Sequence, residues 1–180
     1  MTTWRKLSGP AVLVAALALS VGAGAQAPAP IDACKLLTAA EIAAATGTKV
    51  GVAIPVGGGS TADNSYSSTC VWGVAEDSGR TTIDGPLKGT NFVMLNAWSW
   101  VPGTTGPGHF LQEFRDAAKN NLIDTTPVPI SLGDEALYWG DGVAVRKGAK
   151  NFGISVHVVG GKPTEQTMET ALARKVLERL

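Results

Sequence analysis

The sequence predicts a single α+β domain in which an antiparallel sheet of about six to seven strands packs with three helices. Tight turns, the clearest of them Asp141-Gly142, separate alternating apolar runs and indicate antiparallel pairing. Helical spacing of apolar residues occurs in three segments, near the start, in the middle and at the end. The expected order is therefore helix, three strands, helix, four strands, helix, with one disulfide.

The first 25 residues have the organisation of a signal peptide. Arg5 and Lys6 form a positive start, and the apolar run that follows ends in Ala23-Gly24-Ala25, a small-x-small pattern typical of cleavage. The run is shorter than the roughly 20 apolar residues that span a membrane. The expected organisation is a signal peptide over residues 1–25, a Pro/Ala-rich spacer over 26–31 and one domain over 32–180. The protein is expected in the periplasm or secreted, with no stable membrane anchor after cleavage.

Only two cysteines, Cys34 and Cys70, follow the leader. In an oxidising compartment a lone pair of this kind predicts one disulfide. Neither belongs to a C-x-x-C motif, so a redox pair or thiolate metal site is not indicated. Asp32 argues against a lipidation box around Cys34.

The charge of the mature chain is nearly balanced. Loss of Arg5 and Lys6 leaves 13 basic and 15 acidic side chains, a net charge of −2 without a basic cluster. This composition argues against nucleic acid as a partner.

The stretch from Cys34 to Glu41 marks the start of the domain. Thr38-Ala39-Ala40-Glu41 fits a capping box, and Leu37 and Ile42 are spaced as a hydrophobic staple. The helix is expected to end at Thr46, because Gly47 supplies a left-handed stop.

Three strands follow this helix. Residues 48–56 alternate with period two, the Gly-rich residues 57–65 are expected as a loop, and residues 68–75 place Cys70 and Trp72 on one face. The longest strand covers residues 90–101. Its apolar residues occupy both faces, which predicts a central strand covered on both sides. One face carries Phe92, Met94, Trp98 and Trp100, and the other carries Val93, Leu95 and Ala97.

The second half repeats the alternation of helix and strands. A helix is expected over residues 109–121, and two prolines predict an edge strand over 127–132. A meander then covers residues 136–140, 143–147 and 151–159, with turns at Asp141-Gly142 and Gly148-Ala149. Thr164 is expected to cap the last helix, whose apolar stripe is Met168, Leu172, Val176 and Leu180.

Three motifs together resemble a known bacterial group. They are Cys34-x-Leu36-Leu37-Thr38-x-x-Glu41, Cys70-x-Trp72 and Leu132-Gly133-Asp134-Glu135-Ala136 with Val145-Arg146-Lys147-Gly148. The chain is similar in these to small secreted proteins and lipoproteins, most familiar from actinobacteria, grouped as a domain of unknown function. The resemblance implies an α+β sandwich with a disulfide and transfers no catalytic residues.

No catalytic constellation is evident in the sequence, which contains neither Gly-x-Ser-x-Gly nor Ser-x-x-Lys. His109 and His157 lie in separate elements and are expected at the surface or paired. Asp134, Glu135 and Asp141 come near one another in the hairpin region but match no metal-binding spacing. We therefore expect no metal and no cofactor.

Trp98 and Trp100 point the same way from one strand and are the candidate ligand-binding residues. One interpretation is core packing under a helix, and the other is an aromatic platform for an apolar or carbohydrate ligand. The first functional hypothesis is a non-catalytic extracytoplasmic binding or interaction domain, whose partner is a small molecule, glycan or envelope protein. The alternatives are a periplasmic hydrolase that uses His157 or His109 with a carboxylate, and a structural envelope protein.

Overall fold

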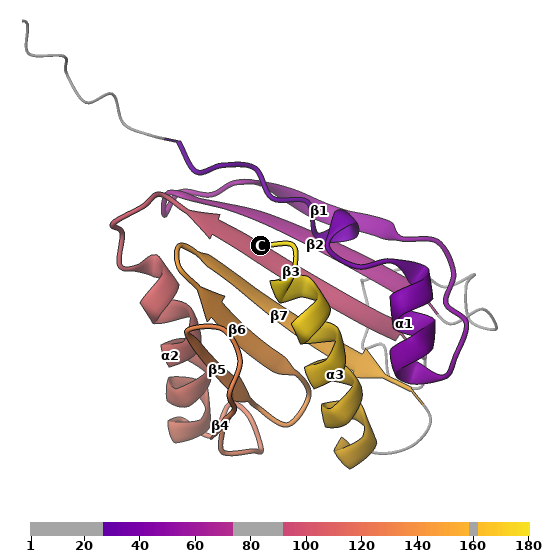
Figure 1. Cartoon of the computed structure of the whole chain (residues 1–180). Helices are drawn as coiled ribbons and strands as arrows, with labels where there is room; N and C mark the ends of the chain where they lie inside the picture. Colours follow the sequence, from indigo (N-terminus) through magenta and orange to yellow (C-terminus); the bar gives the residue numbers. More distant parts are fainter. Residues whose placement is uncertain (1–26, 74–91, 159–161) are drawn as a thin grey trace, which may run out of the picture.

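A computed structural model describes residues 27–73, 92–158 and 162–180, with the side chains of residues 162–164 left out. One antiparallel sheet of seven strands, in the order β1-β2-β3-β7-β6-β5-β4, carries three α-helices and a short 3-10 helix, η1 (Figure 1). The elements are η1 (Ala33–Lys35), α1 (Ala39–Thr46), β1 (Ile54–Ser60), β2 (Ser65–Gly73), β3 (Phe92–Trp100), α2 (Gly106–Lys119), β4 (Val128–Pro129), β5 (Glu135–Tyr138), β6 (Val143–Lys147), β7 (Lys150–His157) and α3 (Lys162–Leu177). The predicted class and element order are confirmed. The expected signal peptide and the expected cap at Thr164 lie outside the described part.

The helix α1 begins as its sequence predicts. The Thr38 hydroxyl accepts a hydrogen bond from the Glu41 amide at 3.2 Å, and a Glu41 carboxylate oxygen accepts one from the Thr38 amide at 2.9 Å. Gly47 ends the helix in the left-handed region at φ 72°. Arg179 donates to the other Glu41 oxygen at 2.6 Å, and this hydrogen bond is the main reason that the pKa of Glu41 falls to about 2. The capping box thus also fastens α1 to the C-terminal end of the chain.

We expect Thr38→Ala to lower the free energy of unfolding by about 1 kcal/mol, because it leaves the Glu41 amide without its capping acceptor. Urea unfolding of the two proteins measures the difference. Thr126→Ala is the matched control, since Thr126 is exposed and no hydrogen bond of its side chain occurs among the described residues. An equal effect of both substitutions would contradict the capping role.

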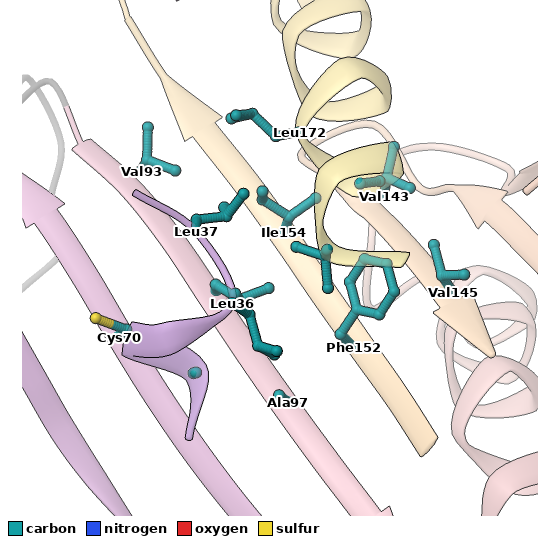
Figure 2. Close-up of a cluster of buried hydrophobic side chains, with 14 of the residues drawn as sticks. Leu36, Leu37, Cys70, Val93, Ala97, Val143, Val145, Phe152, Ile154 and Leu172 are labelled. Atoms are coloured by element: carbon teal, nitrogen blue, oxygen red, sulfur yellow. The ribbon is translucent and has the colours of Figure 1, made fainter. Parts of the chain in front are cut away.

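The disulfide between Cys34 and Cys70 is confirmed, with the two Cα atoms 5.1 Å apart. It joins the segment around η1 to β2. From there Leu36 and Leu37 reach over the sheet, and Figure 2 shows them gathered with Val93 of β3, Ile154 of β7 and Leu172 of α3. These residues belong to the main hydrophobic core, which lies between the sheet and the layer of η1, α1 and α3.

The opposite face of the sheet is covered by α2 at one end. The helix packs Phe110 and Leu111 against Leu137 of β5 and Ala144 of β6, which form a second buried cluster. On β3 the residues toward the main core are fully buried: Val93, Leu95 and Ala97. Those on the α2 side are half-exposed from Met94 to Trp100. The sequence predicted that other elements cover both faces of β3. This prediction is wrong for most of the face on the α2 side, because α2 lies over β5, β6 and β7.

Several element boundaries differ from the sequence prediction: β2 begins at Ser65 instead of residue 68, β4 covers only two of the six expected residues, and β5 covers Glu135–Tyr138 instead of 136–140. The strand expected over residues 48–56 begins only at Ile54 and continues through Gly57, Gly58 and Gly59, which pair with Thr69 to Ser67 of β2. Backbone hydrogen bonding to β2 thus outweighs the weak strand preference of glycine. The helix α2 begins at Gly106 instead of residue 109, because Pro107 fits the first helical turn.

The two edges of the sheet are irregular. On one side β4 has only two residues, of which Pro129 lacks an amide hydrogen. On the other side the pairing of β1 with β2 shifts register between Pro55 and Gly57. None of the described helices has the length and apolar character needed to cross a membrane.

One carboxyl group lies inside the main core. Glu169 on α3 is 1% exposed, and one of its oxygens accepts a hydrogen bond from the Val156 amide of β7 at 3.0 Å. Its other oxygen is buried without a hydrogen-bond partner among the described residues. Burial, reinforced by the negative charges of Glu165 and Asp141, raises the pKa of Glu169 to about 7.

A candidate aromatic binding groove

A groove of about 460 Å³ lies between the end of β3 and one side of α2. We call it the aromatic groove. Both candidate residues named from the sequence, Trp98 and Trp100, line it and are half-exposed. Its other lining residues come from α2, from the segment after α2 and from the turn between β1 and β2: Phe110, Glu113, Phe114, Ala117, Ile123 and Asp63.

The aromatic rings form a connected row. The ring centroids of Trp98 and Phe110 lie 4.8 Å apart, and those of Phe110 and Phe114 lie 5.6 Å apart edge to face. Phe114 then stacks on Trp139 at 4.6 Å. Ring contacts of this kind contribute beyond their burial. Trp98 therefore holds α2 on the sheet as well as lining the groove. The packing interpretation applies to part of this residue, and the ligand platform stays a prediction.

Two contacts fix the start of α2 beside the groove. Asn151, which is fully buried and pairs with Trp98 across β3 and β7, donates from its side-chain nitrogen to the Pro107 carbonyl at 3.0 Å. The Trp100 ring lies against Gly106, where a Cβ atom would come within 2.0 Å of it. The helix can approach Trp100 this closely only because residue 106 is glycine.

The turn between β1 and β2 presents Asp63 at the groove. The Asp63 carboxylate accepts hydrogen bonds from the hydroxyls of Thr61 and Ser65. The turn is itself held to the end of β3, because the Val101 amide donates to the Asn64 carbonyl at 3.2 Å. The Thr61 hydrogen bond is the main cause that lowers the pKa of Asp63, and the carboxylate is therefore ionised at neutral pH.

The second carboxylate of the groove belongs to Glu113, which is exposed on α2. No hydrogen bond or ion pair of Glu113 occurs among the described residues. None of the described lining residues is basic, so the groove combines aromatic walls with two uncompensated negative charges.

The two histidines do not meet. His109 is exposed in the first turn of α2. His157 is exposed at the end of β7, where its Nδ1 lies 3.6 Å from a Glu165 oxygen and its ring lies 5.0 Å from that of Phe92. Within the described ranges no hydroxyl or thiol group donates a hydrogen bond to His157, so the hydrolase alternative has no located nucleophile and stays a prediction.

Asp134 and Glu135, two of the acidic residues of the hairpin region, form ion pairs with arginines. Asp134 and Glu135 both lie 3.5 Å from Arg146 nitrogens, and Glu135 also accepts from Arg115 at 2.6 Å. No group of three or more potential metal ligands occurs in the part of the chain that the structure describes.

A larger hollow of about 610 Å³ lies between residues 130–135 and the end of α3. Most of its charged groups already have partners: Asp134 and Glu135 pair as described, and Glu178 accepts from Lys175 at 2.9 Å. It contains no aromatic side chain. The aromatic groove is therefore the better candidate for a ligand.

Sequence reasoning identified the two tryptophans of the groove but not its two carboxylates. Glu113 could have been predicted from the sequence, because it lies on the same helical face as Phe110, Phe114 and Ala117. A carboxylate on an aromatic stripe is a recognisable departure from core composition. No sequence pattern distinguishes Asp63 as a binding residue, since acidic residues are ordinary in turns.

Comparison of the chain with protein-family models, with curated proteins and with solved structures finds no match. The resemblance to the bacterial secreted group accordingly stays a prediction.

Proposed function

We propose that this protein is a non-catalytic, extracytoplasmic binding domain whose small-molecule ligand occupies the aromatic groove. The observation that carries the proposal is the pair of partly exposed tryptophans, Trp98 and Trp100, on one wall of a cavity built from four segments of the chain. Neighbouring apolar side chains that stay partly exposed around a cavity are a common feature of ligand-binding sites.

The dimensions of the groove favour a small molecule over a protein partner. Its volume of about 460 Å³ lies within the range of roughly 300–1,000 Å³ that is typical of small-molecule sites. The walls are mainly apolar, and the polar groups are few and lie at defined positions, as in sites that orient a ligand.

The chemistry of the carboxylates favours binding over catalysis. A general acid that works near neutral pH needs a raised pKa, whereas the hydrogen bonds from Thr61 and Ser65 lower the pKa of Asp63. Asp63 is therefore suited to hold a fixed negative charge.

The extracytoplasmic location rests on two observations. The Cys34–Cys70 disulfide is consistent with an oxidising compartment. The sequence of residues 1–25 has the pattern of a signal peptide. We infer that the protein acts in the periplasm or after secretion.

Four probes test the proposal: choline, its neutral isostere 3,3-dimethylbutanol, the anion 3,3-dimethylbutyrate and the neutral disaccharide cellobiose. We expect at least one of them to shift the indole N–H resonances of Trp98 and Trp100 in a two-dimensional NMR titration. We expect Trp100→Leu to weaken that binding at least tenfold, because it removes one aromatic wall.

Trp139→Leu is the matched control. Trp139 is also half-buried and contacts Phe114, but it does not line the groove. Both variants are first compared with the wild type by near-ultraviolet circular dichroism to establish that they fold. Absence of groove shifts with all four probes, or equal losses of affinity in the two variants, would contradict the proposed site.

A further inference from the structure

We propose that the ligand of the aromatic groove is an organic cation, of the quaternary or protonated amine class, with an apolar body. This inference rests on the proposed function and adds the charge and chemistry of the ligand. Charge complementarity carries it, because two carboxylates accompany the aromatic rings and no basic group offsets them among the described lining residues.

The ring arrangement suits a cation. The faces of tryptophan and phenylalanine attract positive charge through the ring quadrupole, most strongly for tryptophan. Trp98, Trp100 and Phe114 remain half-exposed around the cavity, so a cation can contact their rings. Phe110 is buried beneath them and supports the wall.

The carboxylates contribute in two different ways. Asp63 is held in place by the hydroxyls of Thr61 and Ser65, so its charge is fixed at the end of the groove formed by the β1–β2 turn. Glu113 lies on the helix side and is exposed, and no ion pair of Glu113 occurs within the described ranges. A ligand cation would therefore be attracted from two separate elements of the fold.

The same features disfavour the other ligand classes. An anion would meet two negative charges at close range, which is unfavourable wherever the groove excludes water. A neutral sugar can stack on tryptophan, but it gains nothing from the net charge of the site. Choline and 3,3-dimethylbutanol have nearly the same shape and differ in charge, so their comparison isolates the electrostatic contribution.

Isothermal titration calorimetry of the purified protein with the four probes tests the inference. We expect choline to bind at least tenfold more tightly than 3,3-dimethylbutanol, and its affinity to fall as salt rises from 20 to 300 mM because salt screens the carboxylates. We expect no measurable binding of 3,3-dimethylbutyrate.

Glu113→Gln assigns the effect to the groove. We expect it to weaken choline binding about three- to tenfold and to leave 3,3-dimethylbutanol unaffected, because the variant changes charge and not shape. Asp116→Asn is the matched control: it removes the same charge from the same helix three residues further on, outside the lining of the groove.

The outcomes distinguish failure of the cation inference from failure of the proposed binding function. Equal affinity for choline and its neutral isostere, or binding of cellobiose alone, would overturn the cation inference and leave the binding function standing. Equal losses in the Glu113 and Asp116 variants would place the cation elsewhere and would also overturn the inference. Failure of all four probes would overturn the inference together with the proposed function.

Discussion

Replacing both cysteines, as Cys34→Ala with Cys70→Ala, is expected to lower the free energy of unfolding by about 3–4 kcal/mol. The disulfide closes a loop with a sequence separation of 36, and the entropy that such a cross-link removes from the unfolded chain has this magnitude. For a domain of this size the midpoint of thermal unfolding should fall by about 10 °C. Urea and thermal unfolding of the two proteins measure the effect.

A reducing agent provides the internal control for this experiment. We expect it to lower the stability of the wild type toward that of the double variant and to leave the variant unchanged. Alanine is preferable to serine, because Cys70 is fully buried and a hydroxyl at that place would need a hydrogen-bond partner. A double variant as stable as the oxidised wild type would contradict the role of the disulfide as a clamp.

Glu169 is expected to make the stability of the protein fall between about pH 4.5 and pH 7. The pKa of this carboxyl rises from 4.5 to about 7 in the folded state, so folding favours the protonated form. The stabilisation that protonated Glu169 contributes to the folded state is complete below pH 4.5 and is lost as the pH rises through 7. The corresponding loss of unfolding free energy is on the order of 3 kcal/mol.

Glu169→Gln should flatten this part of the pH profile. Glutamine keeps an oxygen that can accept the hydrogen bond from the Val156 amide, but it cannot ionise. Urea unfolding of both proteins at pH 4.5, 6 and 8 measures the difference, and the slope of the profile is the quantity to compare. A slope unchanged by the substitution would contradict the assignment.

Other ionisable groups lie close to Glu169 and need a control. Glu165 on α3 and Asp141 in the β5–β6 turn raise its pKa, and His157 of β7 lies 3.6 Å from Glu165. His157→Gln removes the imidazole and keeps Glu169, so this variant should retain most of the pH dependence. If it abolishes the dependence instead, the imidazole and not the buried carboxyl is responsible.

Local signals in the sequence predicted much of the fold. The capping box at Thr38, the alternation along β3 and the Asp141-Gly142 turn each depend on residues close together in the chain, and all three are confirmed. The strand through Gly57, Gly58 and Gly59 was missed because its stability comes from pairing with β2, which no local pattern reveals.

The groove depends on contacts between segments distant in sequence, and this limits its prediction. Trp98 and Trp100 are recognisable from strand alternation, but their exposure depends on where α2 crosses the sheet. That position is fixed by the buried Asn151 and by the glycine at 106. Glu169 likewise lies on the helical stripe of Leu172 and Val176, and only its packing against β7 shows that it is buried.

The irregular sheet edges have a consequence for self-association. A sheet grows into fibres when an edge strand offers a long, flat row of free backbone groups to another molecule. Here β4 is two residues long and contains Pro129, and β1 is bent by its register shift at Pro55 and Gly57. Each described edge thus resists templating by a second chain, so the fold limits its own polymerisation at both sides of the sheet.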